Sequence, residues 1–321
     1  MVNRASRRSP RCPHHLPVEA AGGGAIVTLP AAALLELEQD VELALQSGEH
    51  AHLELLGYGD ISAVLACRAG GRVLACKRLP PFSSPAALDR YARTLRAYLD
   101  RLRAAGVQAL ETELQIVEAG GPAPVAYCVQ PAFDPSSLLT EALGRADAGE
   151  ARALFGPVVD AIAAAVSPRL GLDAGCANWA LLGGQLVYID TSTPLLRDAE
   201  GREEVDVELF LASVPSALRP LVRRFFVGPV LDRFYDLRSV YVDLMSWMLK
   251  EPVRRHVPAL LEVVNARLRG RPITEAELSH YDRTNTALWT LLRRLRRVER
   301  FWQNEILGQT YPFLLPACAL S

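Results

Sequence analysis

The spacing of apolar residues changes once along this sequence, and that change limits the folds open to the chain. Residues 52–132 show the pattern of short strands bounded by glycine and proline, interrupted by one helical stretch at 84–105. After Phe133 the spacing is helical almost throughout, apart from one hairpin at 179–189. The sequence therefore predicts an α+β, two-lobed fold with a small mixed sheet, a larger helical part and a ligand cleft between them.

This pattern divides the chain into three parts. Residues 1–24 are basic and rich in proline and glycine, and we expect them to be poorly ordered. Residues 25–133 form the N-lobe, with an accessory helix after Pro30, five strands and one helix; residues 134–321 form the helical C-lobe. The helices expected in the C-lobe are 136–144, 150–166, 203–213, 216–226, 229–250, 252–268, 274–280 and 283–308.

The amino-acid composition limits the classes of protein to which this chain can belong. Half of the 321 residues are hydrophobic and the formal net charge is −1, so a large core is affordable and no nucleic-acid partner is indicated. The six cysteines form no CxxC pair, and no apolar run reaches the length of a membrane span. We expect reduced thiols, a cytoplasmic location and no membrane partner. Lys77 and Lys250 are the only lysines in the sequence, and a residue type this rare is not readily explained as an incidental surface residue.

The hairpin region carries the first candidate site. Asp173 is followed five residues later by Asn178, and Asp190 ends the second strand of the hairpin. Two acids and an amide at neighbouring strand ends suit a Mg²⁺ ion, with one carboxylate left to orient a hydroxyl. An ordinary hairpin with solvated polar ends has the same pattern.

A second candidate site lies in the N-lobe. Gly57 and Gly59 flank Tyr58 at a strand turn, where close backbone approach lets amide groups face an anion. Lys77 follows twenty residues after Gly57 at the end of the third strand, where its charge can reach phosphates bound under that turn.

Taken in order, these motifs resemble the protein-kinase-like superfamily, and within it the small-molecule branch that includes aminoglycoside phosphotransferases. The glycine loop matches at Gly57, Gly59 and Val64, with Ser62 where the third glycine usually stands. The lysine strand matches residues 73–77, and residues 129–133 fall at the hinge between the lobes. The D-x-x-x-x-N pattern and the metal-binding aspartate follow in the expected order.

The resemblance implies a role for each position. Lys77 and the glycine-loop amides would hold the phosphates of ATP, and the hinge at Gln130 and Ala132 would contact adenine. Asn178 and Asp190 would hold Mg²⁺, and Asp173 would orient the attacking hydroxyl. The implied cofactors are ATP and Mg²⁺, with a hydroxyl-bearing small molecule or peptide as acceptor.

The sequence also departs from the family pattern. Gly171 and Leu172 precede Asp173 in place of histidine and arginine, and residues 191–194 leave little room for a long activation loop. A regulated protein kinase is therefore not expected. No acid stands at the usual position to pair with Lys77; we choose Asp89, with Glu113 as the alternative.

Three functions fit this reading. The first is an ATP-dependent phosphotransferase acting on a hydroxyl group. The second is a catalytically silent nucleotide-binding scaffold, which the missing third glycine favours; the third is a nucleotidyl transferase. Acceptor-side candidates, each of which could equally be a solvated helix residue, are Asp206, Glu208, Asp236, Arg238 and Asp243. The last helix has a basic face, which we interpret as solvated, with a contact to an acidic ligand or a protein partner as the alternative; its residues are Arg293, Arg294, Arg296, Arg297 and Arg300.

Overall fold

A five-stranded antiparallel sheet forms the core of the first half of the chain. The computed structural model describes residues 28–58, 62–117, 124–212, 214–225, 227–250 and 252–314. The strand order is β1-β2-β3-β5-β4, with every neighbouring pair antiparallel. The α+β fold class is confirmed, whereas the expectation of a mixed sheet was wrong. The strands are β1 (Leu55–Tyr58), β2 (Ala63–Ala69), β3 (Arg72–Arg78), β4 (Glu113–Val117) and β5 (Val125–Pro131).

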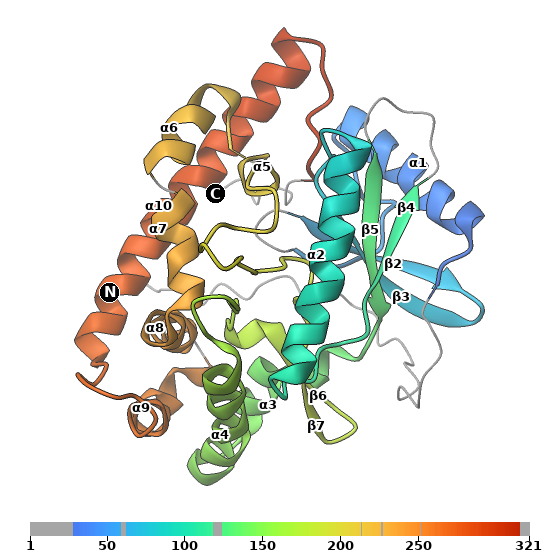
Figure 1. Ribbon diagram of the computed structural model, residues 1–321. Helices are drawn as coiled ribbons and strands as arrows, with labels where there is room; N and C mark the ends of the chain where they lie inside the picture. The colour runs from blue at the N-terminus through green and yellow to red at the C-terminus, as the bar shows by residue number, and fades with distance from the viewer. Residues whose placement is uncertain are drawn as a thin grey trace, which may run out of the picture.

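A helix covers each face of this sheet (Figure 1). Because side chains alternate along a strand, Tyr127 and Val129 of β5 pack with α1 (Ala31–Ser47). Ala126 and Cys128 point to the other face and pack with α2 (Pro85–Ala104). The N-cap Ser84 begins α2 by accepting a hydrogen bond from the Ala87 amide, and proline occupies its first turn.

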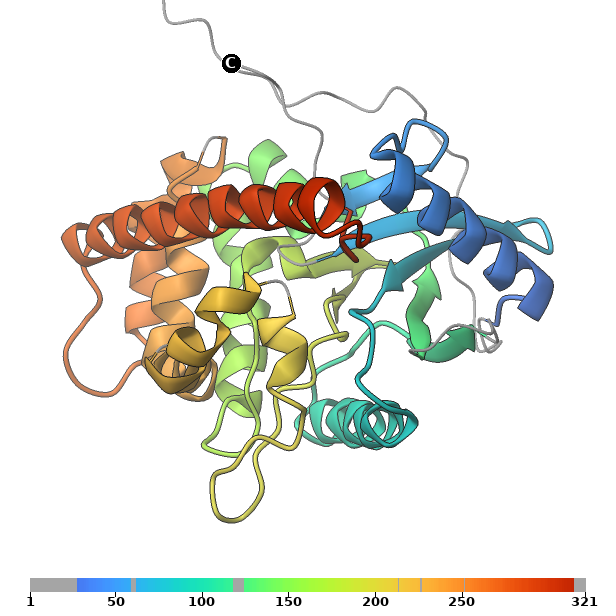
Figure 2. The same ribbon diagram turned by 90° about the horizontal axis from the view of Figure 1, so that it is seen from above.

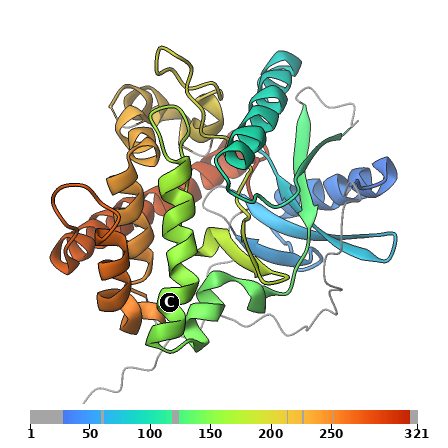
Figure 3. The same ribbon diagram turned by 60° about the horizontal axis from the view of Figure 1, so that its bottom comes forward.

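The second half of the chain is mainly helical and encloses the larger core. Its only sheet within the described residues is a hairpin of β6 (Trp179–Leu182) and β7 (Gln185–Tyr188). In Figure 3 this hairpin lies between α4 and the five-stranded sheet. The helices are α3 (Leu139–Arg145), α4 (Ala148–Ala165), α5 (Glu208–Leu211), α6 (Arg219–Phe225), α7 (Val227–Asp232), α8 (Leu237–Trp247), α9 (Val257–Asn265) and α10 (Glu275–Phe301).

Several helices differ in extent from the prediction. The segment expected at 203–213 is helical only over the four residues of α5. The segment expected at 229–250 is divided, because the Asp236 side chain accepts from the Ser239 amide and caps a new helix. Conversely, α10 runs unbroken through residues 281 and 282, where the prediction placed a gap. No glycine or proline stands there to end it.

The C-terminal end of α10 points toward the side of the molecule that holds the five-stranded sheet (Figure 2). The chain then turns back, and Pro312 accepts a hydrogen bond from Arg78 of β3 through its carbonyl at 3.2 Å. Arg296 is buried, lies over the Phe313 ring and is hydrogen-bonded to Tyr311. The basic face predicted for this helix is thus only partly solvated, because Arg296 points into the contact with the following segment.

Among the described residues, none of the helices combines the length and the apolar character that a membrane span requires.

Candidate functional site at the junction of the sheet and the helical part

Strand register places three of the predicted nucleotide-site residues side by side. Gly57 of β1 is opposite Val64 of β2, and Val64 is opposite Lys77 of β3. Ser62 directly precedes β2 and is half-buried, while Gly59 lies outside the described residues. A side chain built on Gly57 would meet nothing within 4 Å, so its environment leaves room for a ligand above the strand.

An ion pair joins the sheet to the hairpin. Lys77 Nζ lies 2.8 Å from Asp190 Oδ1, with the two side chains 21% and 23% exposed. Ser192 Oγ donates to the same oxygen at 3.0 Å. Burial alone would raise the pKa of Asp190, but Lys77 and Ser192 outweigh burial and the pKa is lowered. Likewise Asp190 raises the pKa of Lys77 against its burial, so both groups are charged at neutral pH.

The loop before β6 holds Asp173 and Asn178 together. Asn178 Nδ2 donates to the Asp173 carbonyl at 3.0 Å, and Tyr188 OH donates to the same oxygen at 3.1 Å. The Gly175 amide donates to Asp173 Oδ1 at 3.4 Å. Asp173 also acts electrostatically on Lys77, since its charge raises the Lys77 pKa. The loop therefore brings Asp173 and Asn178 to the same junction as the Lys77–Asp190 pair.

Close packing explains the glycine that precedes this loop. A side chain built on Gly171 would place its Cβ 2.9 Å from Leu195 Cβ and 3.0 Å from a Tyr235 ring carbon. Tyr98 of α2 donates to the Gly171 carbonyl at 3.3 Å. Glycine is required here because the segments before and after the hairpin approach each other closely.

Helix α2 presents a tyrosine, and not an acid, to this junction. Tyr91 OH donates to the Ser192 carbonyl at 2.7 Å, beside Cys128, which is opposite Lys77 in the sheet. Asp89 is exposed on the same helix, and the carboxylate that Lys77 contacts is Asp190. The choice of Asp89 as the partner of Lys77 was therefore wrong, because that residue lies on the solvent face of α2.

Glu113, the alternative partner of Lys77, lies on β4 and accepts a hydrogen bond from Thr28 at the protein surface. Strand β4 is separated from β3 by β5 in the sheet. The Glu113 carboxylate therefore lies at the edge strand of the sheet, two strands away from Lys77.

The two predicted hinge residues already have protein partners. Gln130 Nε2 donates to the Ile189 carbonyl and to Thr112 Oγ1, both at 2.9 Å, and so fixes the end of β7 against β5. The Ala132 amide donates to the Val73 carbonyl at 3.2 Å. A nucleotide at this hinge would therefore rely on other main-chain groups, or would displace the Ala132 bond.

The segment after Asp190 is short and buried. Thr191 and Ser192 are 0% and 8% exposed, and Thr191 Oγ1 is 2.7 Å from Thr112 Oγ1. Leu195 and Leu196 continue into the core of the helical part. Neither residue was predicted to take part in the site, although their place directly after a candidate metal ligand is the signal that could have found them.

All five acceptor-side candidates have structural partners, and four of them lie at salt bridges or a helix cap. Asp206 faces Arg90, Glu208 bonds Arg223, Asp236 caps α8, and Arg238 pairs with Glu277. Asp243 differs: it is half-buried on α8 and accepts from Tyr281 OH at 2.8 Å.

The donor set at the junction fits a nucleotide-bound magnesium ion. Mg²⁺ in such sites uses one or two carboxylates together with substrate phosphates and water. Asp190 supplies a carboxylate, and Asn178, whose nitrogen is bonded to Asp173, supplies its amide oxygen. Within the described ranges no group of three or more His, Cys, Asp or Glu side chains could bind a metal unaided.

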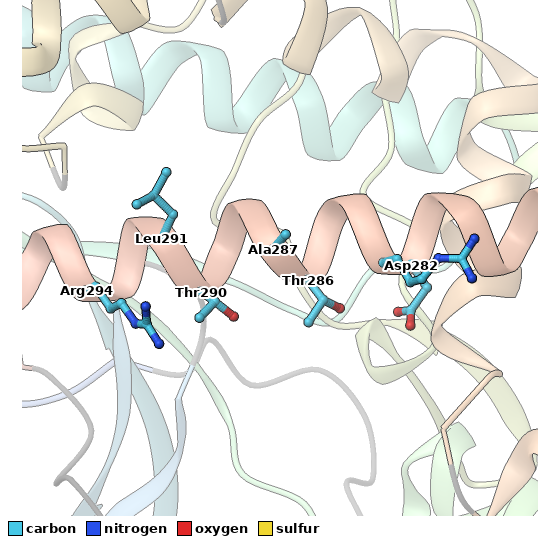
Figure 4. Close-up of a pocket in the computed structure, with 7 residues that line it drawn as sticks. Asp282, Thr286, Ala287, Thr290, Leu291 and Arg294 are labelled. Carbon is cyan, nitrogen blue, oxygen red and sulfur yellow. The ribbon is translucent and has the colours of Figure 1, made fainter.

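One pocket lined by described residues lies away from this junction. Its volume is ≈ 480 Å³ and it runs along α10, where Figure 4 shows Thr286, Thr290 and Arg294 on one side of the helix. Its lining in the described part of the chain is Asp282, Arg283, Thr286, Ala287, Thr290, Leu291 and Arg294. None of these is a predicted site residue, so this pocket and the predicted polar residues lie in different places. The converging polar groups at the junction define the candidate site.

Comparisons with known proteins found solved structures similar to this chain. A solved structure described as WaaP in complex with acyl carrier protein is similar to this chain, with a TM-score of 0.32 and 16% sequence identity over 77% of this chain and 88% of that one. No curated protein matches the sequence. A family model matches residues 36–300, and the chain belongs to that family, the family of unknown function DUF6206.

Proposed function

We propose that this protein transfers the γ-phosphoryl group of Mg-ATP to a hydroxyl group of a small molecule. The observation that carries the proposal is the 2.8 Å contact between Lys77 and Asp190, which joins the sheet and the hairpin at one point beside Asp173 and Asn178. A fixed ammonium, a carboxylate and an amide oxygen are the groups that neutralise and position a transferred phosphoryl group.

In this proposal each residue has a defined task. Lys77 would bind the nucleotide phosphates, and Asp190 and Asn178 would hold Mg²⁺, which would supply positive charge at the phosphates. Asp173 orients the acceptor hydroxyl. A bond forms between the acceptor oxygen and the γ-phosphorus, the bond from that phosphorus to the β,γ-bridging oxygen breaks, ADP leaves, and the hydroxyl proton passes to Asp173 or to solvent.

The short buried segment after Asp190 supports a small-molecule acceptor over a regulated protein substrate. Thr191 and Ser192 are bonded into the junction, so the position in the chain where a protein kinase has a mobile activation loop is occupied by fixed core residues.

Binding of Mg-ATP tests the nucleotide site. At a concentration 100 times the dissociation constant, ligand binding stabilises the folded protein by about 2.7 kcal/mol, which thermal denaturation detects readily. We expect the wild type to be stabilised and Lys77→Ala and Asp190→Asn to lose most of that shift. Arg72→Ala, which removes an exposed charge from the same strand, is the matched control and should keep it. Equal shifts in all four proteins would refute a site at Lys77 and Asp190.

A catalytically silent scaffold is the second candidate, and one observation favours it. Lys77 is paired with Asp190, the proposed metal ligand. An acid on α2 could hold the lysine away from the metal site, but α2 contributes Tyr91 there. Asp173→Asn separates the candidates: an active enzyme should retain Mg-ATP binding and lose transfer. Binding without transfer in the wild type across a broad set of acceptors supports the scaffold, and a product carrying a nucleotide in place of a phosphate supports nucleotidyl transfer.

A further inference from the structure

An indole ring from α8 borders the loop that carries Asp173. A methyl group built on Gly175 would lie 3.4 Å from Trp247 Nε1, 3.5 Å from Asn178 Nδ2 and 3.6 Å from Asp173 Oδ1. The indole N–H, the amide and the carboxylate therefore surround one point on the loop. Trp247 is 39% exposed, so part of its ring is open to a molecule bound beside Asp173.

The second lysine of the chain sits on this ring. Lys250 Nζ lies 3.6 Å from the centroid of the Trp247 ring, which is a cation–π contact, and the Lys250 side chain is exposed. The two lysines of the sequence, far apart in the chain, thus both lie near this loop: Lys77 pairs with Asp190 and has its pKa raised by the charge of Asp173, and Lys250 lies on the ring that borders Gly175. A substrate amine would stack on the Trp247 ring, but the Lys250 ammonium group already covers one face of that ring.

An acid on the same helix is engaged by other side chains. Asp243, one turn earlier on α8, accepts from Tyr281 OH, and Arg233 donates to the same hydroxyl at 2.9 Å. Burial raises the pKa of Asp243, against the hydrogen bond from Tyr281 and the charges of Arg233 and Lys250. Among the described residues, the exposed charge that contacts the Trp247 ring is that of Lys250.

We propose that the acceptor of the phosphotransferase carries an anionic group, a phosphate or a carboxylate, which Lys250 binds while the body of the molecule rests on Trp247. This inference rests on the proposed function, and it specifies the acceptor class: hydroxyl compounds that are already acidic, rather than the cationic amino sugars implied by the aminoglycoside resemblance. A cationic acceptor would meet Lys250 and be repelled.

A local spectroscopic probe tests the acceptor class without requiring turnover. The protein is produced with 5-fluorotryptophan, and its four tryptophan signals are recorded by ¹⁹F NMR, with Trp247→Phe identifying the signal of residue 247. Four sugars of similar size are titrated in turn: glucose, glucose 6-phosphate, glucuronate and glucosamine. We expect the residue 247 signal to shift with one or both anionic sugars at about one-tenth of the concentration needed for glucose, and least with glucosamine. The two anionic sugars distinguish a phosphate from a carboxylate.

Variants of Lys250 show whether its charge is responsible. Lys250→Gln should abolish the preference for the anion and Lys250→Arg should retain it. Arg254→Gln, which removes an exposed charge four residues away, should also retain it. Thermal melting verifies that each variant is folded.

Three results would overturn the proposal: a preference for glucosamine, a preference for anions that survives in Lys250→Gln, or a signal that moves with none of the anions. Failure here with normal Mg-ATP binding would reject only the acceptor class. A preserved anion preference with no Mg-ATP binding would reject the phosphotransferase and leave the anion site standing.

Discussion

At the scale of single residues, Asp243 shows how much the surroundings of an acid decide its behaviour. Its carboxylate faces Tyr281 from α10, Arg233 from the turn before α8, and the charge of Lys250. Burial outweighs the hydrogen bond and both cations, so the pKa of Asp243 is raised. Asp160, exposed on α4 and bonded to Arg267, has a lowered pKa instead.

This contrast predicts opposite pH effects for two matched substitutions. A raised pKa means that the folded state binds the proton more tightly than the unfolded state, so stability falls as pH rises above the ordinary carboxyl value of about 4. Asn at position 243 still accepts from Tyr281 but has no charge to bury. We expect Asp243→Asn to be at least as stable as the wild type at pH 7, with its advantage shrinking as the pH is lowered toward about 4, measured by urea unfolding across that range.

Asp160→Asn is the control with the opposite sign. Its lowered pKa contributes stability above about pH 4, so its loss should destabilise the protein at pH 7 and matter less in acid. Identical pH profiles for the two variants would contradict the assignment.

Sequence spacing could find the members of the candidate site but not their pairing. Lys77, Asp173, Asn178 and Asp190 were singled out because each stands at a strand end or in a motif. Lys77 and Asp190, however, are separated by 113 residues, and no local pattern encodes a contact at that distance. The pairing of Lys77 with Asp89 was predicted from the nearest helix alone. The orientation of Asp89 toward solvent depends on how α2 packs, which the local sequence does not show. Trp247 was missed for the same reason, since its neighbour Gly175 belongs to another segment.

At the scale of elements, local signals predicted most strands and helices, whereas sheet order depended on long-range pairing. The strands of the sheet were expected near their observed positions because glycine, proline and alternating apolar residues mark them. The sheet is antiparallel throughout, and one of its pairings, β3 with β5, joins strands that α2 and β4 separate in the chain. Helix α10 is the main element whose extent was misjudged, and its continuity has a consequence for stability.

Proline substitutions test the continuity of α10. Asp282 lies inside the helix, where proline would remove a main-chain hydrogen bond and clash with the preceding turn, at a cost of about 3 kcal/mol or more. Glu275 is the first helical residue after the N-cap Thr274, where proline is tolerated. We therefore expect Asp282→Pro to lose that amount of unfolding free energy in urea and Glu275→Pro to lose little. A helix broken near residue 281, as the sequence suggested, would tolerate both.

At the scale of the whole molecule, β3 links three distant segments. Lys77 contacts Asp190 on one face of the sheet, and Arg78, the next residue, points to the other face. Arg78 makes two hydrogen bonds to Glu38 of α1, at 2.9 and 2.7 Å, and a third to the Pro312 carbonyl. Tyr127 OH also donates to Glu38, which is only 1% exposed. The helix α1, expected only as an accessory, is fixed to the sheet by a buried ion pair.

Removing one partner of this pair should be costly. Glu38→Ala leaves Arg78 buried without its carboxylate, and breaking such a pair costs about 3–5 kcal/mol. Glu36→Ala, on the exposed side of the same helix, should change the unfolding free energy by no more than about 0.5 kcal/mol. Replacing both partners together, Glu38→Leu with Arg78→Met, should recover part of the loss because no unpaired charge remains. If Glu38→Ala and Glu36→Ala were equally mild, the buried pair would not hold α1 in place.

The contact between Arg78 and Pro312 also sets an order of events during synthesis. The two residues are 234 positions apart, so the ribosome makes the whole helical half after Arg78 and before its last partner exists. The nascent sheet can acquire α1 and the Glu38 carboxylate early, but the third hydrogen bond of that guanidinium waits until residue 312 has left the exit tunnel. Completion of the first-made half of the protein thus depends on one of the last segments of the described chain to be translated.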